Sequence, residues 1–324
     1  MQHTIQHRPF ILDQLRALLR RLPVHHPKYE EVLQFYKRFD AGFAGEQSIG
    51  YHLNFLRDQA FIYQGLSLEL KEKNIKFQVD LILVTPYFLY IGEVKNYSGA
   101  LQFDLERSQL IRTIENRSEV FACPVAQVDR HARLIKLWLQ QHKIPSLPII
   151  PHVIVSNRRA QIAAPPHHPG IYHSDGLLKQ FDRLIQTYPK RVLSKNQLAR
   201  LDKQIQLSHV DTGTNLLQRF DLHVNDILGP PRCSSCRSSR FIPGYQTWSC
   251  QDCRITTRNA HVSCLYDISL LINEPLKRKA FNHLLEHLSK QSILRLLRQY
   301  AVYDGKGYVL SPEKFPASAG NTKV

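Results

Sequence analysis

The chain has 324 residues, of which 43% are hydrophobic and 10% aromatic, and this composition excludes an intrinsically disordered protein. No apolar run reaches the ~18 residues needed to span a bilayer, and the N-terminal residues show no apolar secretion signal, so we expect a cytoplasmic protein with no membrane partner. With 43 Lys and Arg against 27 Asp and Glu, the net charge of +16 favours a nucleic-acid partner, because basic side chains displace counterions from phosphates.

The order of hydrophobic patterns predicts an α/β protein. Residues 10–40 show helical spacing, the run Ala41–Gly45 interrupts it, and a second helix is expected from Glu46 to about Arg57. Helical spacing recurs at 126–141, and strand-like runs are expected at 60–63, 77–84, 88–94 and 149–155. This order indicates an α/β sandwich in which helices flank a mixed sheet.

The segment 156–176 is rich in Pro, Gly and His and is expected to be a peripheral loop or connector. For its histidines 167, 168 and 173, a second metal site is the alternative to solvated loop side chains. Residues 176–208 are basic and show helical spacing. The sequence Gly229-Pro230-Pro231 marks the clearest domain boundary.

Two acidic residues and a lysine stand in the predicted strands. Glu93 and Lys95 are two residues apart, so we expect their side chains on one face of a strand, and Asp80 lies on the preceding strand of the same hairpin. Two carboxylates form a hard oxygen site suited to Mg²⁺ or Mn²⁺, which lowers the pKa of a bound water. Lys95 would orient that water or stabilise charge on a phosphate. The alternative is a structural Glu–Lys pair on an edge strand.

Three further polar residues lie on predicted helices. Glu46 shares a helical stripe with apolar residues, so its carboxylate either faces the metal site or caps the start of a helix. Gln127 and His131 are four residues apart on one helix, in line with apolar residues. Their end of the stripe either faces the site or forms a partly exposed polar pair.

Four segments of the chain resemble the NERD (nuclease-related) domain, a family assigned to the PD-(D/E)XK nuclease superfamily. They are Gly45-Glu46, Gln78-Val79-Asp80, the run Gly92-Glu93-Val94-Lys95-Asn96-Tyr97-Ser98-Gly99, and Pro124-Val125-Ala126-Gln127 with His131. The resemblance covers roughly residues 40–155. It implies a PD-(D/E)XK-type mixed sheet with Glu46, Asp80, Glu93 and Lys95 in the active site, supported by Gln127. Val79 and Gly92 depart from the usual residues, and neither change removes a catalytic group.

Two CxxC pairs follow the domain boundary. Cys233, Cys236, Cys250 and Cys253 are arranged as CxxC–x13–CxxC, so each pair can present two thiolates to one metal. Four thiolates complete a closed tetrahedral shell, which indicates structural Zn²⁺ rather than a catalytic ion. Redox-active CxxC pairs or a rubredoxin-like iron site are the alternatives.

The C-terminal part is the most basic region, since 14 basic and 6 acidic residues follow from Arg232 onward. Three helices are expected between His261 and Tyr300, with Ser289 as the N-cap of the last. The exposed face of that last helix would carry Lys290, Gln291, Arg295, Arg298 and Gln299. With a hairpin at 303–310 as a wing, this arrangement suggests a winged helix-turn-helix; a helical cap with a basic face is the alternative.

These features predict a Mg²⁺- or Mn²⁺-dependent nuclease that hydrolyses phosphodiester bonds, of DNA rather than RNA, and carries structural Zn²⁺. The alternative is an inactive nucleic-acid-binding protein that uses its zinc and helical modules. The expected parts are an N-terminal helical segment (1–40), a nuclease-like domain (41–228, core 41–156), a zinc ribbon-like module (229–260) and a helical C-terminal segment (261–324). No feature of the sequence specifies an oligomeric state.

Overall fold

The computed structural model of the chain describes residues 4–164, 170–210, 213–238, 240–244, 247–316 and 319. His167 and His168, considered above as metal ligands, lie outside the described residues. The chain forms two compact units. Unit 1 comprises Met1–Pro9 and Phe39–Thr212, and unit 2 comprises Phe10–Arg38 and Gly213–Val324. The division into four parts that the sequence suggests stays a prediction, because the two compact units do not test it.

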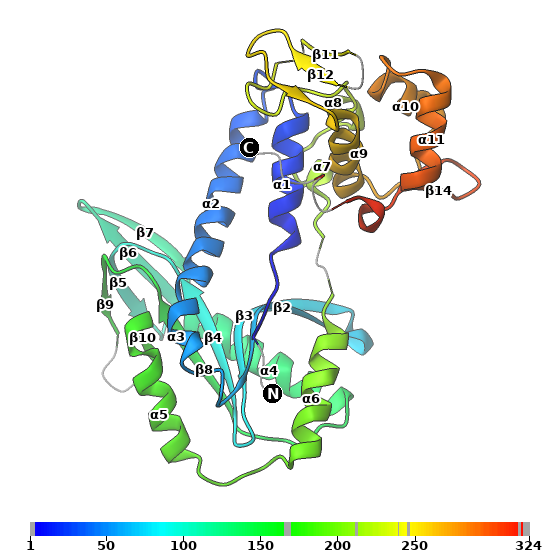
Figure 1. The fold of residues 1–324 in the computed structure, drawn as a ribbon. Coiled ribbons are helices and arrows are strands. Elements are labelled where there is room, and N and C mark those ends of the chain that lie inside the picture. The colour runs from blue at the N-terminus through cyan, green and yellow to red at the C-terminus, as the bar shows by residue number, and fades with distance from the viewer. Residues whose placement is uncertain are drawn as a thin grey trace. The chain divides into compact units, whose positions relative to one another are not determined.

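Unit 1 is built on a mixed six-stranded sheet, as the sequence predicts (Figure 1). Its strands, in spatial order, are β1 (Thr4–Gln6), β2 (Phe61–Leu70), β3 (Ile75–Val84), β4 (Leu89–Lys95), β8 (Ile149–Val155) and β10 (Ile171–His173). The pairs β2–β3 and β3–β4 are antiparallel, whereas β1–β2, β4–β8 and β8–β10 are parallel. The short 3₁₀ helix η1 (Lys71–Lys73) joins β2 to β3.

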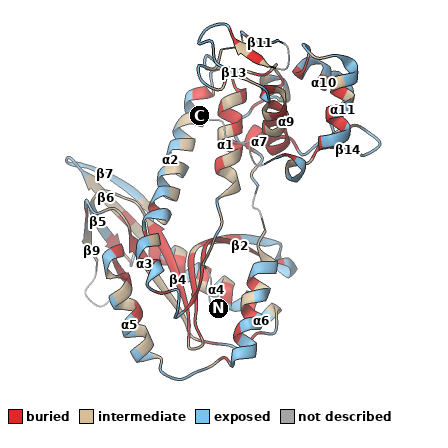
Figure 2. Cartoon of the chain, in the orientation of Figure 1, coloured by how far each residue is buried: buried red, intermediate tan, exposed pale blue. Residues whose placement is uncertain are grey.

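Helices cover both faces of this sheet, so its central strands are buried (Figure 2), and alternate side chains enter two different cores. On one face α3 (Gly50–Asn54) and α5 (Leu177–Thr187), which follows η2 (Ser174–Gly176), pack against Leu81, Leu83 and Tyr90. On the other face α4 (Pro124–Gln141) and α6 (Lys195–Ser208) pack against residues that include Ile82, Val84 and Ile91. The expected α/β sandwich is therefore observed.

The sheet is distorted where β3 meets its two neighbours. Gly65 of β2 has a left-handed backbone (φ +65°). In the register of β2 with β3, Gln64 pairs with Leu81 and Leu66 pairs with Val79, but Gly65 and Asp80, which face each other between these pairs, are not paired. Side chains change faces across this point, since Phe77 and Val79 share a core with Ile82 and Val84. The pairing of β3 with β4 also ends here, at Leu81 and Gly92. The backbone pairing between β3 and β4 therefore does not include Asp80 or the last three residues of β4.

A second, four-stranded sheet was not predicted. Its order is β7 (Arg117–Ala122), β6 (Gln109–Ile114), β5 (Gly99–Asp104) and β9 (Ala160–Ala163). The β6–β7 turn has positive φ at Glu115 (47°) and Asn116 (65°), the conformation usually given to Asn-Gly, so the usual hairpin signal is missing from the sequence. Strands β9 and β10 lie within 156–176, so the expectation of a peripheral loop or connector was wrong for these two stretches.

The helix α2 runs without a break from Tyr29 to Ser48. The predicted interruption at Ala41–Gly45 and the predicted helix start at Glu46 were therefore wrong. Glycine lowers helix propensity by about 1 kcal/mol, but Gly45 has a packing role: a Cβ there would lie 2.5 Å from Asn96 Cβ. Close contact between the helix and the end of β4 favours glycine at this position.

Unit 2 is mainly helical, and its helices share one core. Its helices are α1 (Phe10–Arg21), the first half of α2, α7 (Leu216–Arg219), α8 (Val224–Ile227), α9 (Ala260–Leu271), α10 (Arg278–Leu284) and α11 (Lys290–Tyr300). The hairpin β14 (Ala301–Tyr303) and β15 (Tyr308–Leu310) follows α11 as expected, and η3 (Pro312–Lys314) comes after it. In the core, Leu18 of α1 and Leu265 of α9 are fully buried, so helices from both ends of the chain stabilise one another.

The cysteine segment of unit 2 forms a small three-stranded sheet with the order β11 (Phe241–Pro243), β12 (Trp248–Cys250) and β13 (Thr256–Thr257). Its apolar core is limited to a few buried residues, among them Phe241 and Trp248. So small a core needs an additional source of stability, and a metal is a common one.

Candidate active site

Asp80 is held at the point where the β3–β4 ladder ends. Its Oδ2 accepts a hydrogen bond from the backbone N–H of Val94 at 2.9 Å. The carboxylate thus takes the place of a backbone carbonyl acceptor of β3. The carboxyl groups of Asp80 and Glu93 lie within hydrogen-bonding reach of each other. The distortion of the sheet thus brings together two acids that are thirteen positions apart in the chain.

Glu93 is the most buried acid of the group, with 1% of its surface exposed. Its Oε1 accepts a hydrogen bond from Lys95 Nζ at 2.6 Å, which agrees with the prediction that alternate residues of this strand share a face. Its Oε2 lies 3.5 Å from Nδ1 of His131, and neither atom has a hydrogen-bond partner among the described residues. One oxygen of Glu93 is therefore available to a further ligand.

Helix α4 supplies two polar side chains to the same face. Gln127 Oε1 accepts a second hydrogen bond from Lys95 Nζ at 3.2 Å, and His131 approaches Glu93 one turn further along the helix. The alternative of a partly exposed polar pair does not hold for His131, which is buried, whereas Gln127 is half-buried; both residues reach the carboxylate–lysine group.

Glu46 reaches the group from the last turn of α2. Its carboxylate is half-buried, and Asp80, Glu93 and Lys95 all act on it electrostatically. The alternative of a cap at a helix start is wrong, because Glu46 lies near the C-terminal end of α2 rather than at a beginning. Gln64 Nε2 donates to the Glu46 carbonyl at 3.0 Å and ties this turn to β2.

The close packing of acids shifts their protonation. Burial, followed by the charges of Asp80 and Glu93, raises the pKa of Glu46 to about 8. Burial and the neighbouring Asp80 likewise raise the pKa of Glu93 to about 8, and burial raises that of Asp80. Burial alone would lower the pKa of Lys95, but Glu93 and Asp80 outweigh it and raise the pKa. Burial, with the charges of Arg130 and Lys95, lowers the pKa of His131 to about 4, so the imidazole is neutral.

This set of donors suits a hard divalent cation. The available atoms are carboxylate oxygens, and the raised pKa values show a site whose negative charge lacks sufficient compensation. Among the described residues, Glu46, Asp80 and Glu93 do not all place ligand atoms within 4.8 Å of one another. These three acids therefore do not converge as tightly as the four cysteines described below.

Two supporting contacts were not predicted. The Val94 N–H that orients Asp80 is a backbone group, which no sequence motif specifies. Asn96 donates from Nδ2 to the carbonyl of Ala41 at 2.9 Å and accepts from Asn157 Nδ2 at 3.1 Å, so it joins the C-terminal half of α2 to the segment after β8. A polar residue directly after the Glu-x-Lys strand was the available signal for this link.

The four cysteines also converge, as their spacing predicts. The Sγ atoms of Cys233, Cys236, Cys250 and Cys253 all lie within 4.8 Å of one another. Each CxxC pair is followed by an arginine with φ 61°, Arg237 or Arg254, whose N–H donates to the carbonyl of the first cysteine of its pair. Two matching turns therefore present four thiol groups to one point, which fits a tetrahedral metal site.

Comparison with known proteins bears on unit 1, which contains the first of these two sites. Residues 41–156 match the model of the family described as nuclease-related domain, NERD, which covers a little over a third of the chain. No curated protein and no solved structure matches the chain. In the described part of the chain, no helix is both long and apolar enough to cross a membrane. Residues 41–156 thus form a nuclease-related (NERD) domain that contains Glu46, Asp80, Glu93, Lys95 and Gln127.

Proposed function

We propose that this chain is a divalent-metal-dependent nuclease that hydrolyses phosphodiester bonds of nucleic acid, DNA in preference to RNA. The observation that carries the proposal is the convergence of Asp80, Glu93 and Lys95 beside one unsatisfied carboxylate oxygen. Buried charge of this kind is costly unless it is paired or bound to a metal. Its presence inside a nuclease-related domain favours a catalytic use over a structural one.

Each side chain has a proposed role. Asp80 and Glu93 hold the cation, which when bound lowers the pKa of a water and offsets negative charge on the phosphate. Lys95, held by Glu93 and Gln127, stabilises the charge that develops on the phosphate oxygens. Gln127 positions the Lys95 ammonium group. Glu46 binds and orients a solvent molecule.

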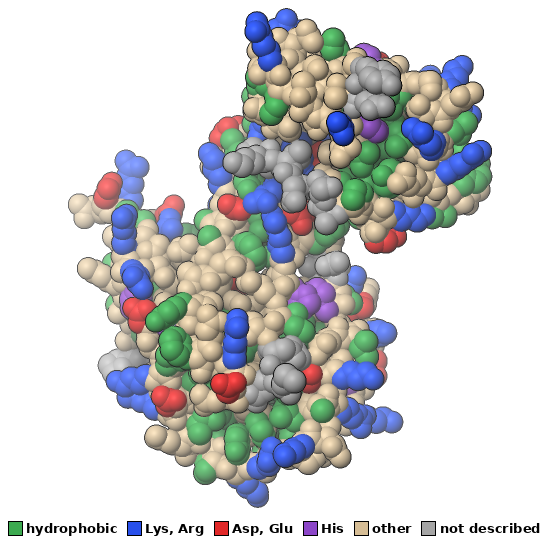
Figure 3. Space-filling model, viewed as in Figure 1, with side chains coloured by type: hydrophobic (Ala, Val, Ile, Leu, Met, Phe, Trp, Pro, Cys, Tyr) green, Lys and Arg blue, Asp and Glu red, His purple; other side chains and the backbone are tan. Residues whose placement is uncertain are grey.

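The substrate assignment rests on charge and on unit 2. Lys and Arg side chains are scattered over the face of both units seen in Figure 3, which suits contact with a phosphate backbone. All five predicted face residues of α11 are exposed: Lys290, Gln291, Arg295, Arg298 and Gln299. With β14–β15 as a wing, we propose that α11 contacts the major groove of DNA and that Zn²⁺ stabilises the cysteine module.

A cleavage assay tests the proposal. Zinc-loaded protein is incubated with circular, linear and single-stranded DNA and with RNA, with Mg²⁺, with Mn²⁺ or with neither ion. We expect cleavage of DNA only with an added ion, and a loss of at least about 100-fold in Lys95→Ala and Asp80→Asn. Lys136→Ala, an exposed lysine on α4, is the matched control and should cleave as the wild type does. Equal cleavage by Lys95→Ala, Asp80→Asn and the wild type would overturn the proposal.

The second candidate is a nucleic-acid-binding protein without turnover. The short Lys95–Glu93 contact favours it, because the lysine already neutralises the carboxylate that should bind the cation. This alternative predicts salt-sensitive DNA binding with no cleavage under any ion. The same assay, followed by binding measurements at two salt concentrations, separates the two functions.

A further inference from the structure

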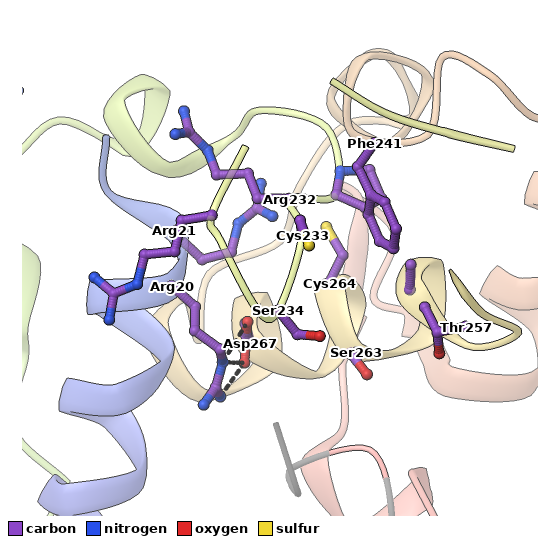
Figure 4. A pocket seen from close by; sticks show the side chains of 13 residues that line it. Arg20, Arg21, Arg232, Cys233, Ser234, Phe241, Thr257, Ser263, Cys264 and Asp267 are labelled. Carbon is purple, nitrogen blue, oxygen red and sulfur yellow. Dashed lines mark hydrogen bonds and ion pairs between the residues drawn. The ribbon is translucent and has the colours of Figure 1, made fainter. Parts of the chain in front are cut away.

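Four arginines line a small cavity of unit 2, next to the cysteine cluster but outside it. Arg20 and Arg21 come from α1, and Arg232 and Arg237 come from the cysteine segment. Figure 4 shows the lining side chains, among which the hydroxyl-bearing Ser234, Thr257 and Ser263 come from the cysteine segment and α9. The cavity of about 50 Å³ has room for a few water-sized groups.

Two of these arginines are engaged by the protein itself. Arg20 is bound to Asp267, with Nε 3.1 Å and 3.0 Å from the two carboxylate oxygens. Arg21 is only 3% exposed and donates to the carbonyls of Ile227, Gly229 and Pro230, which hold the chain before the cysteine segment. Carbonyl groups satisfy the donors of Arg21 but do not neutralise its charge.

The other two arginines have no carboxylate partner in the part of the chain that the structure describes. Arg232 is half-buried and has no ion pair among the described residues. Arg237 is also half-buried, and its guanidinium lies 5.6 Å from the centre of the Tyr29 ring. Both guanidinium groups thus add positive charge to the lining of the cavity.

The charges around the cavity do not balance. Asp267 is the single carboxylate of the described lining, against four guanidinium groups. A zinc ion with four thiolates would carry a charge of about −2, and Cys233 alone of its ligands lines the cavity. Even if that whole charge is counted, positive charge remains. Buried charge without compensation is costly, so an anionic ligand would stabilise this region.

We propose that this cavity binds a single phosphate group, held by Arg232 and Arg237 with help from the neighbouring hydroxyl groups. Guanidinium groups bind phosphate oxygens through paired, charge-assisted hydrogen bonds. The cavity volume suits one phosphate and not a whole nucleotide. The group is either free phosphate or the terminal phosphate of a nucleic-acid strand. This site does not depend on the nuclease function proposed for unit 1.

The two CxxC turns provide a matched pair of variants. Arg237 and Arg254 follow their cysteine pairs with the same φ of 61°, but of the two only Arg237 lines the cavity. Arg237→Gln and Arg254→Gln therefore remove the same charge from equivalent backbone positions. Arg232→Gln and the double variant Arg232→Gln/Arg237→Gln complete the series, with Lys95→Ala to exclude binding at the candidate nuclease site.

The test measures phosphate binding by the zinc-loaded full chain, by calorimetry and by the phosphate-dependent rise in Tm. We expect saturable binding in the wild type, Arg254→Gln and Lys95→Ala, and binding at least tenfold weaker in Arg237→Gln and the double variant. Zinc content and circular dichroism show whether each variant is folded. If the double variant does not fold, the comparison of Arg237→Gln with Arg254→Gln decides.

A second set of titrations identifies the source of the phosphate. An oligonucleotide with a 5′-phosphate is compared with its 5′-hydroxyl counterpart. A preference for the 5′-phosphate in the wild type that disappears in Arg237→Gln supports a strand terminus, whereas an effect confined to inorganic phosphate supports a free anion. If no phosphate binds, or if Arg237→Gln and Arg254→Gln bind it equally, the arginines only hold the fold and balance the thiolates, and the proposal is wrong.

Discussion

The two units each concentrate buried charge, but of opposite sign and by different routes along the chain. In unit 1, Asp80, Glu93 and Lys95 come from one hairpin. Protonation of the acids and the positive charge of Lys95 reduce the excess negative charge there. In unit 2, Arg21 reaches carbonyls more than 200 residues away, and the excess charge is positive. The comparison shows that a charged site is easier to recognise in a sequence when its central members are near one another in the chain.

Removing zinc should have the largest effect, and it separates the two units. The chain has two tryptophans, Trp138 in unit 1 and Trp248 in unit 2, and both are almost fully buried. A Trp138→Phe background therefore reports the cysteine module alone. Structural zinc contributes on the order of 10 kcal/mol to the folding of small modules, so chelation should shift the Trp248 emission to longer wavelength.

The reciprocal background is the control for that experiment. In Trp248→Phe, emission from Trp138 should not change on chelation, because its neighbours belong to the sheet of unit 1. Cys253→Ser should reproduce the effect of the chelator and lose bound zinc. Unchanged Trp248 emission in the metal-free protein would show that the module folds without zinc.

The second prediction concerns the one acid of unit 1 that does come from afar. The position of Glu46 depends on the close contact of Gly45 with Asn96. A Cβ added at Gly45 would lie 2.5 Å from Asn96 Cβ and 2.9 Å from Ser156 Oγ. Gly45→Ala should therefore destabilise the protein by about 1–3 kcal/mol, as overpacking does, and weaken cleavage by displacing Glu46. Urea unfolding and cleavage rates measure both effects.

Gly42 on the same helix provides the control for this prediction. A Cβ at Gly42 meets no atom within 4 Å, so Gly42→Ala should stabilise the helix by up to about 1 kcal/mol and leave cleavage unchanged. If both substitutions stabilise the protein equally, the close contact between α2 and β4 does not limit the position of Glu46.

Much of unit 1 could be predicted because its signals are local. The turn at 85–87 and the two-residue spacing of Glu93 and Lys95 specify the hairpin and the shared face, and the apolar runs specify the buried strands. The second sheet was missed because its strands are partly exposed and its β6–β7 turn uses Glu115 and Asn116 in place of glycine. The course of α2 was missed because tertiary packing at Gly45 outweighs the local preference of glycine.

The arginine cavity could not be predicted for a different reason. Neither Arg20-Arg21 nor Arg232 forms a motif, and their proximity follows from the packing of α1 against α9, which single-sequence patterns do not encode. The cysteines of the same unit were predictable because the two CxxC pairs are close in sequence and chemically specific. Within unit 2, therefore, the site whose members are close in sequence was predicted and the site whose members are far apart was not.

The smallest expected effect is the pH dependence caused by Glu46. Its pKa is near 4.5 in the unfolded chain and about 8 in the folded protein, so the folded state prefers the protonated acid. This contribution to stability is complete below pH 4.5 and is lost as the pH rises through 8. Glu46→Gln removes the loss, so the variant should match the wild type at pH 4 and exceed its stability at pH 9. We expect a gain of about 1 kcal/mol, because solvent screening and the coupling to Asp80 and Glu93 keep the effect well below the ~5 kcal/mol of the full shift.

The measurement compares urea unfolding at pH 4 and pH 9, without added divalent ions and with zinc retained. Glu30→Gln, at an exposed position of the same helix, is the matched control and should show no such pH-dependent gain. A gain in Glu46→Gln that disappears when Mg²⁺ is added would tie the instability to missing positive charge, because a bound cation compensates the same carboxylates. Equal pH profiles for wild type and Glu46→Gln would instead mean that Glu46 is solvated, and the buried negative charge of unit 1 would then reduce to the hairpin acids alone.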